Sequence, residues 1–204
     1  MKDYSQHGEG RIIANYFAGF TGTLISLGEN DGKTLSNVLG LIQSGWTAHL
    51  VEPSKKSFDK LQALHENNLA VRCYNYAIAG YDGKIDFYES GEHLGSGDHS
   101  LLSTTNPGEI SRWKGTAEFK KTTVPCKTFD SFLKEAHLKH FYLISIDCEG
   151  VDLEILRQID FGATGTQAVI VETNSVKDDL YIGRMKTFGF KVLHKNYCNL
   201  IFVR

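Results

Sequence analysis

Short apolar runs alternate along the chain with amphipathic stretches of helical spacing. The apolar runs cover residues 23–27, 48–51, 71–75, 142–146 and 168–171. Strands that are buried on both faces and separated by helices are typical of a mostly parallel sheet, so the pattern predicts an α/β fold. Two last runs, 191–194 and 200–203, flank the turn residues 196–199 and predict a C-terminal antiparallel hairpin.

The stretches between these runs predict the covering helices and the connections. Helices are expected over 9–19, 33–44, 128–138 and 178–188, in a stretch carrying Leu153, Leu156 and Ile159, and after Ser54, an N-cap residue. Residues 76–79 and 85–88 flank Asp82-Gly83 and predict a hairpin added to the sheet. Residues 90–111 are rich in Gly, Ser, Thr and His and predict an active-site loop.

The size of the chain suits one domain. Its 204 residues are expected to form a single α/β domain over 1–204, in which 1–22 is an N-terminal helical segment. The 22 Lys and Arg residues against 24 Asp and Glu residues give a net charge of −2, which argues against a nucleic-acid partner. No apolar run approaches the about 18 residues of a membrane span. Four scattered cysteines fit a reducing, cytoplasmic location.

The turn after the first strand carries the strongest sign of a ligand. It reads Gly28-Glu29-Asn30-Asp31-Gly32, and Glu52 ends the second strand 20 residues beyond Gly32. A nucleotide-binding α/β fold places there an acid that accepts the two ribose hydroxyls, so an adenosine-containing cofactor is expected. The G-x-G-x-x-G cradle of a pyrophosphate is absent from the turn. S-adenosylmethionine, which has ribose and adenine but no phosphate, fits better than a dinucleotide.

Several segments together resemble a known family. They are SQHGE at 5–9, LGENDG at 27–32, LSN at 35–37, GWT at 45–47, VEP at 51–53, NYAI at 75–78, KTFD at 127–130 and ISIDCEG at 144–150. The chain thereby resembles the FkbM-type S-adenosylmethionine-dependent methyltransferases nearly end to end. The resemblance implies a Rossmann-like class I methyltransferase fold and methylation of a hydroxyl group on a sugar or small natural-product acceptor.

The resemblance and the turn chemistry together select the residues expected around the cofactor. These are Gly28, Glu29, Asn30, Gly32, Glu52, Pro53, Asn75 and Ala77. Three positions depart from the family pattern: Ser26 stands where the first strand usually carries an acid, Glu29 where a small residue is usual, and Ser145 where a Lys is frequent.

Asp147 and Glu149 are the expected catalytic residues. They follow the fourth strand, at the sheet edge where open α/β folds bind their ligands. Either carboxylate is a candidate base for the acceptor hydroxyl. The N-terminus of the helix that follows is expected to lower their pKa values. The alternative to a catalytic role is that these acids only cap this helix. Asp147, Glu172 and Asn174 resemble the ligands of metal-dependent catechol-type methyltransferases, which leaves magnesium as a less favoured alternative.

The acceptor side is expected to involve Gln6, His99 and Trp113, which lies between Arg112 and Lys114, whereas Trp46 is expected in the core. A small-molecule or saccharide acceptor is the expected partner, with no nucleic acid and no membrane. Two other functions stay open at this point: a cofactor-binding module of the same fold without turnover, and a nicotinamide-dependent oxidoreductase suggested by Glu52 alone.

Overall fold

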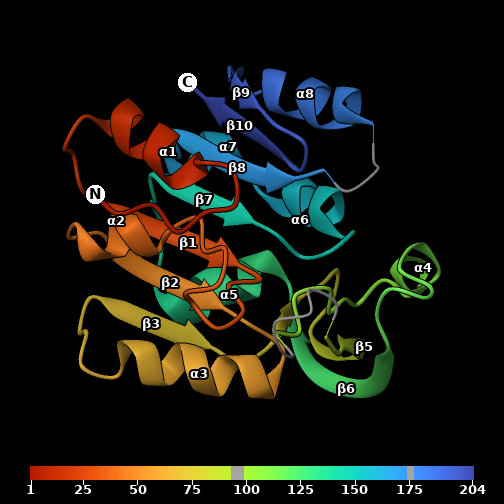
Figure 1. The fold of residues 1–204 in the computed structure, drawn as a ribbon. Coiled ribbons are helices and arrows are strands. Elements are labelled where there is room, and N and C mark those ends of the chain that lie inside the picture. The colour runs from red at the N-terminus through yellow and green to blue at the C-terminus, as the bar shows by residue number, and fades with distance from the viewer. Residues whose placement is uncertain (93–98, 174–176) are drawn as a thin grey trace.

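A seven-stranded sheet forms the centre of the computed structural model, which describes residues 1–92, 99–173 and 177–204. In spatial order its strands are β3 (Val71–Tyr74), β2 (Thr47–Val51), β1 (Thr23–Leu27), β7 (Leu143–Ile146), β8 (Ala168–Glu172), β10 (Asn199–Val203) and β9 (Lys191–Lys195) (Figure 1). The first five are parallel, whereas β10 is antiparallel to both β8 and β9. The predicted mostly parallel sheet and its C-terminal hairpin are confirmed.

Helices cover both faces of this sheet. One face carries α1 (Glu9–Phe17), α2 (Leu39–Gln43) and α3 (Lys55–His65), and the other carries α5 (Phe129–Ala136), α6 (Asp152–Gln158), α7 (Phe161–Thr164) and α8 (Asp178–Lys186). Successive strand residues serve opposite faces, as the period of two requires: Leu24 packs toward the α1 side and Ile25 toward the α5 side. Ser54 caps α3 as expected, and Trp46 is buried in the core.

The expected helix over 33–44 is wrong for its first half, because only α2 is helical there. The Asp31 carboxylate accepts hydrogen bonds from the backbone N–H groups of Lys33 and Thr34, and the Ser36 hydroxyl accepts one from Leu39. Such side-chain bonds offer the backbone an alternative to helical bonding. The segment 31–38 is therefore a series of turns that leads back over the strand ends.

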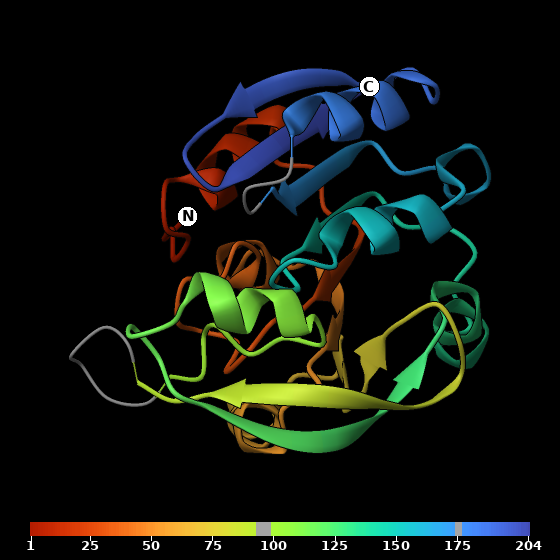
Figure 2. The same ribbon diagram turned by 90° about the vertical axis from the view of Figure 1, so that its right-hand side faces the viewer.

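The expected hairpin of 76–79 with 85–88 is also wrong. A second, three-stranded sheet forms instead, in the order β4 (Ala77–Ile78), β6 (Phe119–Lys127) and β5 (Gly83–Ser90), and its two long strands run along the bottom of Figure 2. The Asp82 carboxylate accepts bonds from the Thr128 N–H and the Ser131 hydroxyl, so it ties the turn to α5 rather than closing a hairpin.

Part of the expected loop over 90–111 is regular. Asn106 accepts a bond from the Gly108 N–H and caps α4 (Pro107–Arg112), in which proline takes the first turn, where its missing N–H does no harm. Residues 93–98 of that expected loop lie outside the described residues. The helices within the described ranges are all too short or too polar to cross a bilayer.

Candidate active site

A pocket of about 390 Å³ lies at the carboxyl ends of β1, β2, β7 and β8, a size usual for small-ligand sites. These strand ends point to the side of the molecule where α4 and the small sheet lie (Figure 1). Segments from elsewhere in the chain add to the wall, among them residues 6–7, 34–37, 76–78, 100–105 and 112–113, and the turn 197–199 between β9 and β10. The pocket thus sits at the sheet edge that the sequence predicts.

Gly28 brings two strand ends into direct contact. Its φ is 78°, and a Cβ added there would lie 1.8 Å from the carbonyl oxygen of Asp147. Its N–H donates to the Val51 carbonyl at 2.9 Å, so the β1 turn is held against both neighbouring strands. Gly32, also at positive φ, faces α3, because its added Cβ would meet Leu61 at 2.6 Å. Of the two expected glycines, Gly28 therefore lines the pocket and Gly32 supports the turn from behind.

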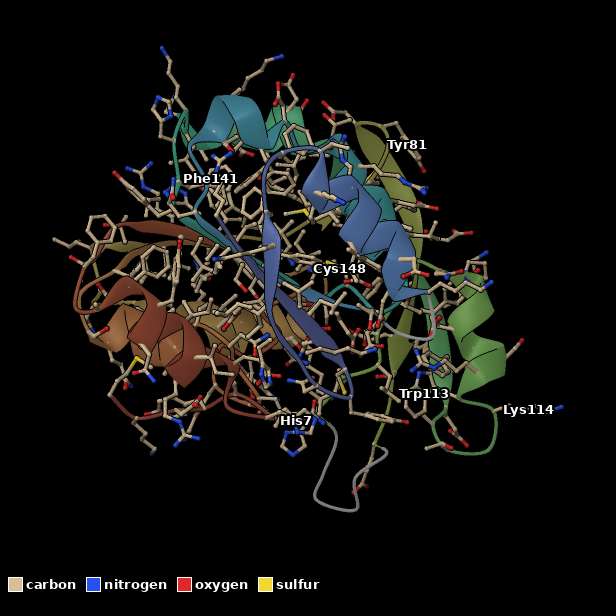
Figure 3. The ribbon with its side chains drawn as sticks, turned by 90° about the horizontal axis from the view of Figure 1, so that it is seen from above. His7, Tyr81, Trp113, Lys114, Phe141 and Cys148 are labelled. Carbon is tan, nitrogen blue, oxygen red and sulfur yellow. The ribbon has the colours of Figure 1, made fainter. Side chains whose placement is uncertain are left out.

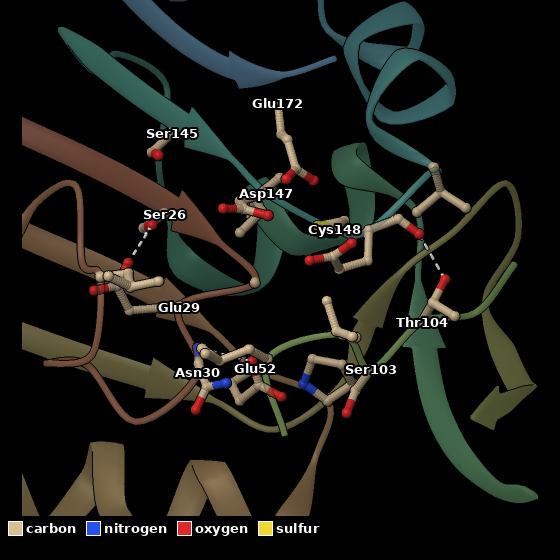
Figure 4. A pocket seen from close by; sticks show the side chains of 18 of the residues that line it. Ser26, Glu29, Asn30, Glu52, Ser103, Thr104, Ser145, Asp147, Cys148 and Glu172 are labelled. Atoms are coloured by element: carbon tan, nitrogen blue, oxygen red, sulfur yellow. Dashed lines mark hydrogen bonds between the residues drawn. The ribbon is translucent and has the colours of Figure 1, made fainter. Parts of the chain in front are cut away.

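Glu29 and Ser26, two of the departures from the family pattern, contact each other (Figure 4). The Glu29 carboxyl accepts a bond from the Ser26 hydroxyl at 2.5 Å and another from the Ser36 hydroxyl at 2.5 Å. Burial raises the pKa of Glu29 to about 7. The turn thus places a carboxyl group beside the end of β1, where the strand itself has serine.

Glu52 lies at the end of β2 with both oxygens engaged by backbone groups. One accepts from the Asn30 N–H at 2.9 Å and the other from the Ser54 N–H at 2.7 Å. Burial raises its pKa to about 7. Each carboxylate oxygen has a second lone pair, so both can still accept a ligand hydroxyl.

The other expected cofactor residues divide between the wall and its support. Pro53 and Ala77 line the pocket beside Glu52. Asn75 supports them, because its side-chain amide donates to the carbonyls of Glu52 and Pro53 at 2.9 and 3.1 Å. The Asn30 amide donates to the backbone carbonyl of His99 at 2.9 Å, which ties the turn to the segment covering it.

Three carboxyl groups meet at the ends of β7 and β8. One oxygen from each of Asp147, Glu149 and Glu172 lies within 4.8 Å of the others, and Asp147 and Glu172 face one another in Figure 4. Burial raises the pKa of Asp147 to about 6 and that of Glu172 well above its usual range. A hydrogen bond joins these two side chains, so the protonation of one carboxyl group depends on that of the other.

Two expectations about these acids are wrong. The helix N-terminus does not dominate the pKa of Asp147, because burial outweighs it. N-capping does not explain the acids either: Val151 occupies the N-cap of α6, and no side-chain cap bond is present there within the described chain. Asp152 holds this turn instead, because its carboxylate accepts hydrogen bonds from the Cys148 and Gly150 N–H groups at 2.7 and 3.0 Å.

The expected acceptor residues are placed unevenly. Gln6 and Trp113 line the pocket, and Lys114 points away into solvent (Figure 3). His99 contacts the site through its backbone, and its side chain is outside the set of described residues lining the pocket. Asn174 lies outside the described residues.

Sequence reasoning missed the turn 197–199 as part of the wall. Tyr197 there is 95% exposed and Asn199 only 4% exposed. This turn has no periodicity or spacing that could have placed it beside the ends of β7 and β8. Residues 100–105, which also line the pocket, fall within the loop 90–111 that the sequence predicts at the active site.

The pocket is strongly acidic. Its described lining contains the carboxyl groups of Glu29, Glu52, Asp147, Glu149 and Glu172. Among the described lining residues, Arg112 is the only one that is a lysine or an arginine, and its side chain forms an ion pair with Glu109 at 2.9 Å. Such a site favours a ligand that carries positive charge.

Comparison with known proteins agrees with this geometry. The family model described as Methyltransferase FkbM domain matches residues 26–192. The structure of Methyltransferase FkbM from Methylobacillus flagellatus KT aligns with a TM-score of 0.55 at 11% identity, over 90% of this chain and 44% of that one. This chain therefore spans less than half of that protein.

Two further structures share the fold at low identity. The ribosomal protein L11 methylase from Lactobacillus delbrueckii subsp. bulgaricus aligns with a TM-score of 0.50 at 12% identity, over 96% of this chain and 77% of that one. The METTL16 MTase domain aligns with a TM-score of 0.52 at 9% identity, over 96% and 64%. The search of curated proteins found no match. At these identities the structures show a class I methyltransferase fold.

Proposed function

Since the chain belongs to the FkbM family of S-adenosylmethionine-dependent methyltransferases, we propose that it methylates a hydroxyl group of a saccharide or small natural-product acceptor. The observation that carries the proposal is the line of carboxyl groups along one pocket. It runs from Glu52 at β2, through Glu29 at β1, to Asp147 at β7. These carboxyl groups suit the ribose hydroxyls and the two positively charged groups, sulfonium and ammonium, that the cofactor presents.

The residues present fit the cofactor. Gly28 keeps the turn after β1 close to the pocket, where a larger residue would collide with Asp147. Glu52 is held in place by two backbone N–H groups and retains lone pairs for the ribose hydroxyls. Glu29, anchored by two serines, supplies negative charge beside the end of β1.

When bound, S-adenosylmethionine supplies a methyl carbon on a positively charged sulfur, which keeps the C–S electron pair as the acceptor oxygen takes the methyl group. The chain's own task is to hold the acceptor in line and to receive its hydroxyl proton. Asp147 is the best-placed acceptor of that proton, because burial brings its pKa to about 6, nearer neutrality than an ordinary aspartate. Glu149 lies within the same cluster.

A small, uncharged acceptor suits the outer half of the pocket. Trp113 and the exposed Tyr197 offer aromatic faces to a sugar ring, and Gln6 offers an amide for its hydroxyl groups. The excess of carboxyl groups repels a polynucleotide backbone. We therefore expect a saccharide or similar polyol rather than a nucleic acid. The four free cysteines suit an enzyme of the cytoplasm.

The test separates binding from turnover. Titration calorimetry with S-adenosylmethionine is expected to show binding that Glu52→Ala abolishes. Asp147→Asn is expected to keep cofactor binding and lose methyl transfer to a panel of sugars, measured by mass spectrometry. Glu154→Gln, an exposed change on α6, serves as the matched control. Cofactor binding without transfer to any hydroxyl acceptor would support the non-catalytic module and refute the proposal.

A further inference from the structure

The three carboxyl groups at the ends of β7 and β8 are spaced for a single cation. One oxygen from each of Asp147, Glu149 and Glu172 lies within 4.8 Å of the other two. Magnesium and calcium bind oxygen at about 2.1 and 2.4 Å, so opposite ligands lie about 4 to 5 Å apart. The carboxyl groups therefore stand at the separation that such an ion requires.

Asn199 adds an independent sign of a ligand at the same place. Its side chain is 4% exposed and lines the pocket, and its Oδ1 is buried with no hydrogen-bond partner in the described part of the chain. Asn199 pairs directly with Glu172 across the antiparallel strands β8 and β10, which puts the two side chains on one face of the sheet. Buried carbonyl oxygens are rarely left without a partner, because this is energetically unfavourable, so the Asn199 oxygen points to a ligand at this position.

The orientation of the Asn199 amide is set by Glu9. Its Nδ2 donates to a Glu9 carboxylate oxygen at 2.7 Å, and Asn196 donates to the same oxygen at 2.6 Å. A carboxylate accepts hydrogen bonds and cannot donate one, so Glu9 bonds the amide nitrogen of Asn199 and leaves the amide oxygen facing away from it. Asn196 differs in one respect: its own oxygen already accepts from the N–H groups of Cys198 and Asn199.

We propose that Asp147, Glu149, Glu172 and the Asn199 side-chain oxygen bind one divalent cation of the magnesium or calcium type. All four are hard oxygen ligands, as these ions prefer. The set differs from the less favoured trio of Asp147, Glu172 and Asn174 that the sequence suggested in drawing its amide ligand from β10; Asn174 lies outside the described residues. The site needs no methyl transfer to exist, but its use in holding and acidifying the acceptor hydroxyl rests on the proposed function.

The direct test is titration calorimetry with magnesium chloride, and then calcium chloride, on the chelator-treated full chain without cofactor. Binding of one ion per chain is expected. Asn199→Ala should weaken it by at least about tenfold, and Glu172→Gln by more. Thermal melting checks that each variant is folded. Failure of the folded wild-type chain to bind either ion would overturn the site.

Asn196→Ala is the comparison variant, because it removes the other amide bound to Glu9 and the acceptor of the Cys198 and Asn199 N–H groups without removing a pocket oxygen. Its cation affinity should fall clearly less than that of Asn199→Ala. Equal losses in both asparagine variants would show that Asn199 acts only through Glu9, and would overturn its assignment as a ligand. S-adenosylmethionine binding is measured in parallel: if it persists where the cations fail, only the cation site is refuted.

Discussion

Replacing Gly28 by alanine is expected to disrupt both the fold and the cofactor side of the pocket. At a φ of 78° a residue with a Cβ pays about 1 to 2 kcal/mol in backbone strain. The new Cβ would also stand 1.8 Å from the Asp147 carbonyl oxygen, whereas ordinary contact begins at 3.4 Å. The ends of β1 and β7 must therefore move apart by more than an ångström.

That movement has a calculable consequence. It strains the hydrogen bond from the Asp147 N–H to the Leu27 carbonyl, now 3.0 Å, and its loss in a buried place costs about 1 to 3 kcal/mol. Together with the backbone strain, Gly28→Ala should lower the free energy of unfolding by about 2 to 5 kcal/mol. Urea denaturation measures this loss, and calorimetry with S-adenosylmethionine should show binding abolished.

Gly189→Ala is the matched control. Gly189 has nearly the same φ, 81°, but an added Cβ would meet no atom within 4 Å among the described residues. It should lose only the about 1 to 2 kcal/mol of backbone strain and keep cofactor binding. Equal losses of stability in the two variants, with binding intact in both, would refute the argument from close approach.

Three other substitutions test separate parts of the chain. Glu29→Gln removes the charge beside β1 and should weaken S-adenosylmethionine binding by about tenfold in calorimetry, roughly the 1.4 kcal/mol of one charge-assisted hydrogen bond; unchanged affinity would make Glu29 purely structural. Burial, with Arg72 nearby, lowers the pKa of His49 to about 4 from 6.5, so the unfolded chain gains a proton first as pH falls. Stability is therefore lost from pH 6.5 down to 4, by up to about 3 kcal/mol, and His49→Asn should flatten this loss in urea titrations at several pH values. Ser54→Ala should lower the unfolding free energy by about 1 kcal/mol, because α3 loses its N-cap; a stability equal to the wild type's would show that water replaces the cap.

The sequence predicts the central sheet well, for a physical reason. Strands such as β1 and β8 are buried on both faces, and their apolar runs leave no other stable arrangement. The strand β6 was not predicted, because its middle, residues 120–123, is Lys-Lys-Thr-Thr and has no apolar run. These residues are exposed in the three-stranded sheet. Its partner β5 was found, but paired with the wrong strand, since Asp82 bonds to Thr128 rather than closing a turn.

The site was predictable where it follows strand ends and obscure where it depends on side-chain bonding. Glu52 and Asp147 end apolar runs, so topology alone places them at one edge. Ser26 and Glu29 looked like two separate departures from the family pattern, and only the fold shows them bonded to each other. Asn199 carries no motif, and its unpartnered oxygen becomes visible only in the packed structure.

The contact between Glu9 and the β9–β10 turn also orders the events of folding. Glu9 bonds to Asn199, 190 residues further along the chain, and β10 must first insert between β8 and β9. Contacts of such long sequence separation form slowly, because the entropy of closing a large loop is lost before the contact can stabilise the fold. During synthesis, the turn at 197–199 can complete the wall of the pocket only after residue 199 has left the ribosome. The part of the pocket beside β10 is therefore expected to form last.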